Sequence, residues 1–220
     1  MAPPARQRIL EATARLIRER GVARLTTRQI AEAADAAEGS ITKNFGGKAG
    51  LLSALLSEEL PELRAWQTAA TPPGQRPLRA VLTDLIARGI DYYTAALPIL
   101  AVAQADHDLL AEHRKANAAH GTGPQLAIDQ ITAYLTACRQ AGQIAPTADP
   151  YALATTLCGA AHIQAYTERL AGPQALRGTR EDRIAALVDI LLAAAAPQGL
   201  SRSVRSARSP GDAASPRSPE

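Results

Sequence analysis

The chain has 220 residues and a formal net charge of +3; alanine accounts for 48 residues and aromatic side chains for only 3%. Alanine favours helices, and strands prefer the aromatic and β-branched residues that are scarce here, which argues against a β-sandwich or β-barrel. Two cysteines without CxxC spacing argue against a disulfide scaffold. The longest apolar run spans the nine residues 95–103, too short for a membrane helix, and the first residues lack a signal peptide's apolar stretch. The composition predicts a soluble, cytoplasmic, all-α protein.

Charge is distributed unevenly along the chain. Residues 1–50 hold nine Lys or Arg against five Asp or Glu, whereas residues 51–200 hold eleven against fourteen. A basic N-terminal segment on a mildly acidic body indicates that one end meets a polyanion. Residues 201–220 hold six Ser, three Pro and four Arg and have almost nothing to bury, so we expect a disordered tail.

Hydrophobic periodicity and helix-ending residues predict about nine helices and no convincing strand. Thr26 and Gln29 have the spacing of a capping box that opens the second helix. A long helix is expected from Lys48 towards Thr68, with a bend at Pro61. The first three helices and two later ones are expected over about 6–20, 27–34, 37–44, 108–119 and 125–141.

The middle and last helices are marked by proline and by N-terminal caps. An apolar stripe begins at Leu78, and Pro98 indicates a new helix start. Asp149 precedes a proline at the first helical position, a favoured arrangement. Thr179 is followed three residues later by Asp182, which opens the last helix. We therefore expect the last two helices over 150–170 and from Thr179 to Pro197.

Residues 6–48 have the order of a helix-turn-helix domain, in which a helix is followed by two short helices joined by a tight turn. Small residues at 31, 33 and 34 let the helices cross closely. Ala37, Ile41 and Phe45 recur every four residues and are expected to face inward. The residues left to face outward on the third helix are polar or small: Glu38, Gly39, Ser40, Thr42, Lys43 and Asn44.

Over about its first 55 residues the sequence resembles the TetR (tetracycline repressor) family of bacterial transcriptional regulators. The residues that carry the resemblance are Arg8-Ile-Leu-Glu-Ala, Leu16, Gly21, Thr26-Thr27, Ile30-Ala31, Ala33-Ala34, Glu38-Gly39-Ser40-Ile41, Asn44-Phe45, Lys48 and Leu51-Leu52. The resemblance implies a helix-turn-helix head over 1–50 and a helical ligand-binding and dimerisation body over 51–200. It also implies a homodimeric repressor that binds a pseudo-palindromic DNA operator and is released by a small-molecule effector.

Four positions depart from the family's usual pattern. Asp35 replaces glycine at the turn, and aspartate tolerates left-handed backbone better than most residues. Ala36 stands where valine is usual. Ala37 lacks a capping hydroxyl worth typically about 1 kcal/mol. Thr42 lacks the aromatic ring that often lies on the DNA backbone. These changes affect contact details more than the fold.

The resemblance also implies which residues contact DNA: Thr26, Thr27, Arg28, Glu38, Gly39, Ser40, Thr42, Lys43, Asn44 and Lys48. Threonines at a helix start and lysines suit phosphates, whereas Asn44 can pair with adenine and Glu38 can accept from cytosine. The alternative for Glu38 is an acid favoured by the helix dipole. For Gly39 the alternatives are a tolerated glycine and a close approach of backbone to the DNA groove.

By the same resemblance, the last two helices of each chain pair into a four-helix bundle. The candidate interface residues are Ala152, Thr156, Gly159, Ile184, Leu187, Val188 and Leu191. The alternative is that these residues cover the core of one chain.

A ligand pocket needs apolar walls with a few polar groups. The candidates are the scarce large side chains of the body and two neighbours on the same helix faces: Trp66, Tyr92, Tyr93, Tyr134, Cys138, His162 and Tyr166. Such a pocket suits a neutral or weakly polar aromatic molecule. The alternative is that these residues only pack.

No cofactor, metal or enzymatic activity is expected. His107, His113 and His120 stand too far apart along one helix to share an ion easily, and are taken as ordinary surface histidines. Cys138 is taken as a small buried residue rather than a nucleophile. The alternative function is that of an all-helical enzyme or small-molecule-binding protein without a role at DNA, and a gel-shift assay separates the two.

Overall fold

The computed structural model describes residues 3–20, 25–105 and 107–196, and every regular element within these ranges is helical. Because these elements are all helices, the predicted all-α fold is confirmed. The tail that we expect to be disordered, 201–220, lies outside the described residues. The elements are α1 (Ala5–Arg20), α2 (Thr27–Ala33), α3 (Gly39–Phe45), α4 (Lys48–Ala54), a π-helical turn η1 (Leu55–Glu59), α5 (Pro61–Gln67), α6 (Leu78–Ala105), α7 (His107–His120), α8 (Gln125–Gln140), α9 (Pro150–Ala171), a 3-10 turn η2 (Pro173–Ala175) and α10 (Arg180–Ala195).

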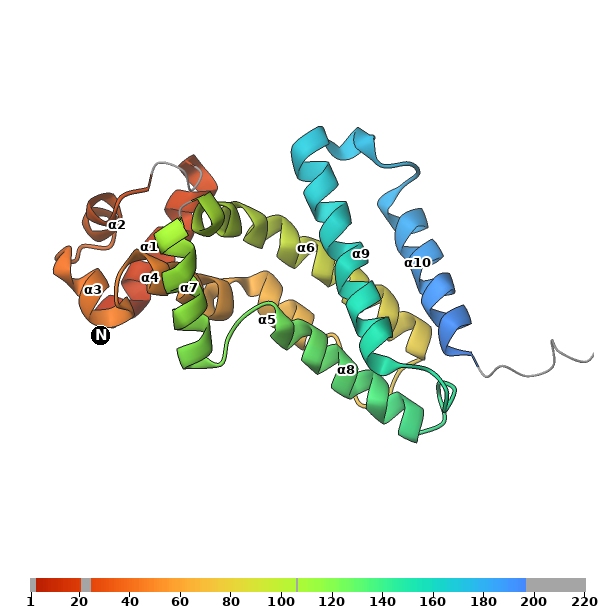
Figure 1. The fold of residues 1–220 in the computed structure, drawn as a ribbon. Helices are drawn as coiled ribbons and strands as arrows, with labels where there is room; N and C mark the ends of the chain where they lie inside the picture. Colours follow the sequence, from red (N-terminus) through yellow and green to blue (C-terminus); the bar gives the residue numbers. More distant parts are fainter. Residues whose placement is uncertain (1–2, 21–24, 106, 197–220) are drawn as a thin grey trace, which may run out of the picture.

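The helices divide into two groups joined by the longest one. Figure 1 shows α1 to α4 gathered at one end, which we call the head, and α8 to α10 at the other, while α6 runs between them. Two hydrophobic clusters follow this division: one holds the buried residues of α1 to α4 and η1, and the other those of α5, α8, α9 and α10. Because Ala96 and Ile99 of α6 belong to the head cluster, apolar contacts cross the boundary expected at residue 50.

The turn chemistry of the head follows the sequence closely. The predicted capping box is present: the Thr26 hydroxyl accepts from the Gln29 backbone N–H, and the Gln29 side chain accepts from the Thr26 backbone N–H. Asp35 adopts the left-handed conformation predicted for the turn, with φ of 49°. Gly46 ends α3 at φ 74°, where a side chain is strained. One inward position is wrong: α3 begins at Gly39, after the N-cap Glu38, so Ala37 precedes the helix and is exposed.

The helix expected from Lys48 towards Thr68 is divided into three shorter elements, and the bend expected at Pro61 is a break in the helix between Leu60 and Pro61. Leu60 is extended, with φ −74° and ψ 111°, as favoured by the residue that precedes a proline. Pro61 then occupies the first position of α5, where its missing N–H costs nothing. A single π-helical turn separates α4 from this break.

Pro98 does not start a new helix, because α6 continues through it from Leu78 to Ala105. By length and mean hydropathy, α6 is the one helix among the described residues that could cross a membrane. Its apolar composition has another explanation in the packing, since its buried residues contact α5, α9 and α10. α6 is therefore the central helix of the fold.

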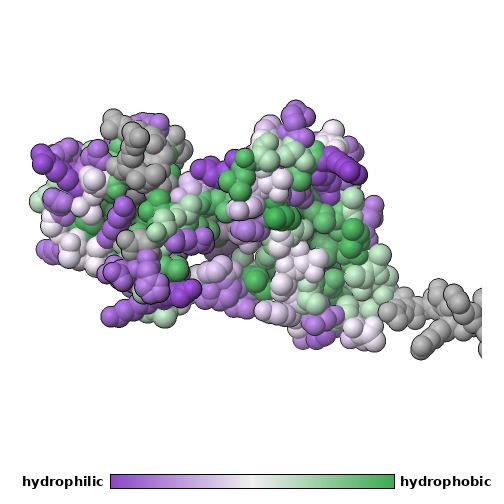
Figure 2. All heavy atoms as spheres, turned by 45° about the horizontal axis from the view of Figure 1, so that its top comes forward, coloured by the Kyte–Doolittle hydropathy of each residue, from purple (hydrophilic) through white to green (hydrophobic). Residues whose placement is uncertain are grey.

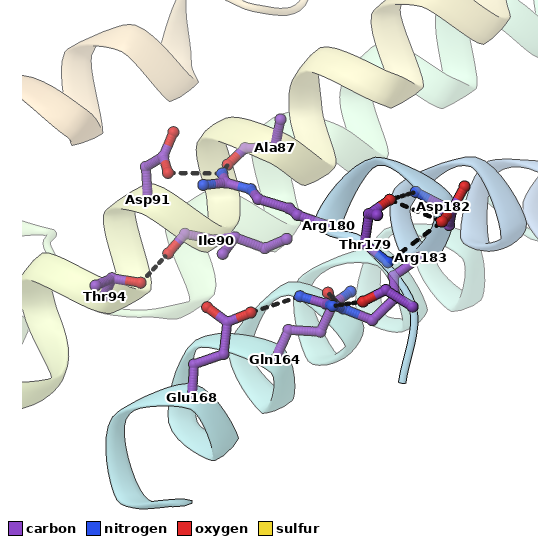
Figure 3. Close-up of polar contacts among 11 residues, drawn as sticks. Ala87, Ile90, Asp91, Thr94, Gln164, Glu168, Thr179, Arg180, Asp182 and Arg183 are labelled. Atoms are coloured by element: carbon purple, nitrogen blue, oxygen red, sulfur yellow. Dashed lines mark hydrogen bonds and ion pairs between the residues drawn. The ribbon is translucent and has the colours of Figure 1, made fainter. Parts of the chain in front are cut away.

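Two arginines fix the start of α10 to its neighbours (Figure 3). Arg180 donates to the Asp91 carboxylate at 2.6 Å and to the Ala87 carbonyl at 2.8 Å, both on α6. Arg183 donates to the buried Gln164 side-chain oxygen at 2.9 Å and pairs with Glu168 on α9. The predicted caps Asp149 and Thr179 are both present. The start of α10 is thereby held against both α6 and α9.

Candidate DNA-binding head and ligand cavity

The exposed face of the head is formed by α3 and the N-terminal end of α2. Ile41 is buried and anchors α3, whereas Thr42, Lys43 and Asn44 are exposed. Phe45, the core anchor expected from the sequence, is half-buried against the head cluster, and the Arg6 guanidinium lies 5.1 Å from its ring centroid. Lys48, at the start of α4, is half-buried. The arrangement leaves a helix with polar side chains directed to solvent.

Several polar residues predicted to contact DNA already have partners within the head. The Thr27 hydroxyl donates to Glu38 Oε1 at 2.6 Å, which ties the starts of α2 and α3 together. The Asn44 amide donates to the Ser40 carbonyl at 2.7 Å. Arg28 pairs with Glu32 one turn later, at 2.9 Å, with both side chains largely exposed. These exposed contacts leave the groups accessible, and their predicted roles at DNA stay predictions.

Arginines of α1 hold the turn between α2 and α3, a role that sequence reasoning missed. Arg8 donates to the carbonyls of Ala34 and Asp35, at 3.1 and 3.0 Å, and Arg15 donates to the Ala33 carbonyl at 3.2 Å. Carbonyls at a helix end lack intrahelical partners, so these bonds satisfy them. Part of the basic excess of the N-terminal segment is therefore structural.

Arg6 links α1 to the π-helical turn. Its guanidinium pairs with both carboxylate oxygens of Glu58, at 2.6 and 2.8 Å. This hydrogen bonding holds the pKa of Glu58 below its ordinary value, so the carboxylate stays ionised at neutral pH. The turn that follows α4 is thus tied to the head.

Gly39 stands where the chain itself does not require glycine. A Cβ built there meets no atom within 4 Å. Packing within the chain therefore gives no reason for the missing side chain, and both interpretations, a tolerated glycine and a close approach of the backbone to the DNA groove, stay predictions.

A cavity of about 150 Å³ lies where the head meets the body. Its walls are contributed by α4, η1, α5, α6, α7, α8 and the turn between α7 and α8. The residues that line it are Ser53, Leu56, Ser57, Leu63, Trp66, Gln67, Ala70, Leu85, Tyr92, Tyr93, Leu100, His113, Asn117, Thr122, Gly123, Pro124, Leu126, Ala127, Gln130 and Ile131. None of these residues is Asp, Glu, Lys or Arg, so the described lining contains no carboxylate, ammonium or guanidinium group.

The structure brings three of the predicted pocket residues together. The rings of Trp66, Tyr92 and Tyr93 have centroids 5.3 to 5.5 Å apart and line the cavity. His162 packs edge-on against Tyr93 at 5.0 Å, and Tyr166 stacks on His162 and is 44% exposed. The remaining two, Tyr134 and Cys138, are buried in the body cluster. These last four predicted residues are not among the lining residues.

Burial keeps the cavity's phenols neutral. It raises the pKa of Tyr92 to about 12 and shifts the pKa of Tyr93 upward as well. Interaction with the Cys158 thiol raises the pKa of Tyr93 further. At neutral pH both groups therefore act as neutral hydrogen-bonding groups.

His113 is not the ordinary surface histidine expected from the sequence, since only 6% of it is exposed. Its Nδ1 lies 2.7 Å from Ser53 Oγ on α4, and its Nε2 lies 3.2 Å from the Asn117 amide. Thr122 donates to Asn117 Oδ1 at 3.1 Å. A buried polar chain therefore links α4 to α7. Leucines at 109 and 110, one turn earlier, are the sequence signal for this buried face.

The stability of the protein is expected to fall in mild acid because of His113. Burial lowers its pKa below the ordinary 6.5, so the unfolded chain binds a proton at a higher pH than the folded chain does. This contribution is present above pH 6.5 and is lost as pH falls towards the lowered pKa. Urea unfolding of wild type and His113→Gln at several pH values measures it. An identical pH dependence in the two proteins contradicts the assignment.

Within the described ranges, no group of three or more His, Cys, Asp or Glu side chains could hold a metal ion. Cys138 and Cys158 are free and buried. Burial raises the pKa of both thiols, that of Cys158 to about 12, so neither is a ready nucleophile.

The surface of the last two long helices is unusually apolar. The large hydrophobic residues exposed in the described chain are Tyr151, Ile163, Tyr166, Leu170 and Ile190. All of them lie on α9 and α10, at the end of the molecule where Figure 2 shows hydrophobic side chains on the surface, whereas the head is mostly hydrophilic.

The residues predicted for the dimer interface divide between surface and core. Ala152, Thr156 and Gly159 are exposed on α9. Ile184, Val188 and Leu191 are buried in the core of their own chain, and Leu187 is half-buried against it. For α10 this burial favours the alternative, in which the stripe covers the core of its own chain. Its apolar residues cover α6 and α9, and the exposed face of α10 carries Ile190 instead.

Comparison with known proteins agrees with this geometry. Residues 9–55 match the model of the bacterial regulatory proteins of the tetR family. Over 55 residues the chain is 44% identical to YvkB of Bacillus subtilis (strain 168), an uncharacterized transcriptional regulator of helix-turn-helix type. That match covers 25% of this chain and 29% of the relative, so it is confined to less than a third of the relative's length.

Similarity in fold extends much further. A TetR-family regulator from Mesorhizobium loti superposes with a TM-score of 0.67 at 20% identity, over 86% of this chain and 95% of its own. SmeT in complex with triclosan gives 0.60 at 24% identity, over 89% and 93%. FadR, a fatty acid degradation regulator from Bacillus halodurans, gives 0.60 at 16% identity, over 87% and 96%. Residues 9–55 are therefore similar to the helix-turn-helix domain of tetR-family regulators, and the described chain has the fold of the regulators on which it superposes.

Proposed function

We propose that the protein is a cytoplasmic transcriptional repressor that binds a pseudo-palindromic operator as a homodimer and is released by a small molecule in the cavity. One observation carries the proposal: α4 contacts α3, on the exposed face of the head, and also contributes Ser53 to the cavity. A ligand in the cavity thus touches the helix that supports the DNA-facing helix. SmeT, similar in fold, is known as a complex with triclosan, which supports a small-molecule effector.

The release mechanism is a shift between two populations. Two heads fill successive major grooves only when they lie about 34–36 Å apart. An effector that binds better to the misspaced arrangement lowers DNA affinity by its differential binding energy. The hydrogen bond between Ser53 of α4 and His113 of α7 joins these two helices, and both residues line the cavity. It therefore connects the lining of the cavity to the head.

Selection from random DNA duplexes with the full chain tests operator binding. We expect an inverted repeat whose half-sites are centred one helical turn apart, or a multiple of it. Fluorescence anisotropy on the selected duplex then measures affinity and its loss with an effector. If selection enriches no sequence, the regulatory proposal is wrong.

Gly39→Ala is expected to weaken operator binding without harming the fold. Its new methyl group meets no atom of the chain within 4 Å, and alanine favours a helix by up to about 1 kcal/mol over glycine. The methyl group would instead occupy the space between α3 and the groove floor. Anisotropy and urea unfolding measure the two effects. Unchanged operator affinity in a stable variant would remove Gly39 from the DNA contacts.

Dimerisation is expected to use the exposed apolar face of α9 and α10. Ile163 is 55% exposed and Ile190 60%, and large exposed apolar patches mark interaction surfaces. The double variant Ile163→Asp, Ile190→Asp places two carboxylates on this face and should yield a monomer in light scattering. Ala118→Asp, at an exposed position of α7, is the matched control. A double variant that stays dimeric would place the interface elsewhere.

A further inference from the structure

Gly89 lies where three helices meet beside the cavity. It belongs to α6, is buried, and faces Ala161 of α9 and Trp66 of α5. A Cβ built on Gly89 would lie 3.1 Å from the Ala161 Cβ, 3.1 Å from Trp66 Cζ2 and 3.2 Å from Trp66 Cε2. All three distances are shorter than ordinary van der Waals contact. The missing side chain therefore lets the edge of the indole pack directly on the backbone of α6.

The indole of Trp66 packs against two tyrosine rings and borders the cavity. The residue is 3% exposed, and its ring centroid lies 5.3 Å from that of Tyr92 and 5.5 Å from that of Tyr93. Trp66 also lines the cavity of about 150 Å³. The position of the indole therefore determines part of the volume that is open to a ligand.

A side chain at position 89 could be accommodated by a separation of α6 from α9 or by a shift of the Trp66 ring. Ala161 is fully buried, and its Cβ is attached directly to α9 and cannot rotate away. α6 makes its most extensive contacts with α9, and separating two close-packed helices breaks many contacts at once. The Trp66 ring, by contrast, stands beside empty volume, and a shift of a few tenths of an ångström relieves the contact. The ring is therefore the part that moves.

We propose that Gly89 determines the size of the ligand that the cavity accepts, because its missing side chain lets Trp66 lie back against α6. A side chain at this position would push the indole into the cavity and exclude larger ligands. Gly89 is not among the lining residues and acts through Trp66, so it is a positioning residue. This inference rests on the proposed function, in which the same cavity holds the effector.

Benzene and ethylbenzene measure the size limit by calorimetry on the full chain. A cavity of about 150 Å³ is known to hold a compound with one benzene ring. The two additional carbons of ethylbenzene bury more apolar surface, so wild type should bind it about tenfold more tightly than benzene. In Gly89→Ala this preference should fall at least about threefold, while the affinity for benzene stays within about twofold, because a close-packed site responds to a single methyl group. An unchanged preference in a folded variant would overturn the proposal.

Arg88→Ala is the matched control, at the adjacent exposed position of α6. It also introduces an alanine into this turn of the helix, but it places no new methyl group against Trp66. The preference for ethylbenzene should therefore remain that of wild type. An equal loss of preference in Arg88→Ala would show that the helix as a whole, and not the contact at Gly89, is responsible.

Trp66→Phe tests whether the alanine acts through the tryptophan. Phenylalanine has a single, smaller ring and lacks the indole edge that meets position 89, so adding Gly89→Ala to Trp66→Phe should leave the preference unchanged. An equal effect of the alanine in both backgrounds would make the proposal wrong. The same double variant covers a Gly89→Ala protein that does not fold. Recovery of a cooperative urea transition in the double variant would support the contact, and continued failure would contradict it.

Anisotropy on the selected operator keeps this inference apart from the proposed function. If ethylbenzene binds with the expected size dependence but leaves operator affinity unchanged at saturation, ligand-driven release fails while the size limit stands. If the operator is bound but neither hydrocarbon binds wild type, the size limit is wrong while operator binding stands.

Discussion

Gly50→Ala is expected to destabilise the head by about 3 kcal/mol, because the new side chain collides with backbone. A Cβ at Gly50 would lie 1.7 Å from the carbonyl oxygen of Phe45 and 2.9 Å from its carbonyl carbon. Neither atom belongs to a flexible side chain, so α3 and α4 must move apart. The close approach follows from the tight Gly46-Gly47 turn, which folds the start of α4 back onto the end of α3.

Urea unfolding measures this effect, and operator anisotropy measures its consequence. The DNA-facing helix is displaced together with its support, so operator affinity should fall along with stability. Gly39→Ala is the matched control for the unfolding measurement, since the same substitution eleven residues earlier enters open space. A Gly50→Ala protein whose free energy of unfolding stays within about 0.5 kcal/mol of wild type would contradict the geometry at this junction.

Features that depend on a few neighbouring residues could be predicted from the sequence. The capping boxes at Thr26 and Thr179, the cap at Asp149 and the left-handed turn at Asp35 are all present. Each is determined by side chains that bond to backbone within three residues, or by the conformational preference of one residue. The all-α fold follows from the same local signals repeated along the chain.

Features that depend on distant packing could not be predicted. Proline is a local signal, yet it begins a helix at Pro61 and lies inside one at Pro98, because surrounding contacts decide which outcome is tolerated. Ile184 and Ile190 both belong to an apolar helix, and only the position of α6 and α9 determines which of them is buried. The close approach at Gly50 likewise requires α3 and α4 to be placed against each other.

The residues that line the candidate cavity could likewise be predicted only in part from the sequence. Trp66, Tyr92 and Tyr93, which the scarcity of aromatic residues singles out in the sequence, line the cavity together, and their role in ligand binding stays a prediction. Helix-face spacing alone placed Tyr134 and His162 with them, although these residues pack beside the cavity rather than in it. His113 was assigned to the surface because its polar partner Ser53 is 60 residues away in sequence. Hydrogen bonds between residues so far apart in the chain leave no local pattern in the sequence.

We expect the affinity of the head for DNA to depend mainly on a small number of basic side chains that contact phosphates. Of its basic side chains, Arg6, Arg8 and Arg15 bond to the protein itself. Lys43 is exposed on α3 and Lys48 stands half-buried at the start of α4. Together with the exposed Arg28, these two lysines are the described basic positions from which we expect phosphate contacts, each releasing condensed counterions from the duplex.

Lys43→Ala with Lys48→Ala should weaken binding to all DNA sequences and reduce the salt dependence. Each lost phosphate contact lowers the slope of log K against log salt by about one, so the double variant should lose about two units for each bound head. Anisotropy between 50 and 200 mM salt gives the slope on operator and on random duplex. Lys115→Ala, at an exposed position of α7 outside α2 and α3, is the control and should leave the slope unchanged. Because the lysines carry no base readout, the ratio of specific to nonspecific affinity should stay nearly constant while both fall. An unchanged slope in the double variant would show that DNA contacts the protein elsewhere.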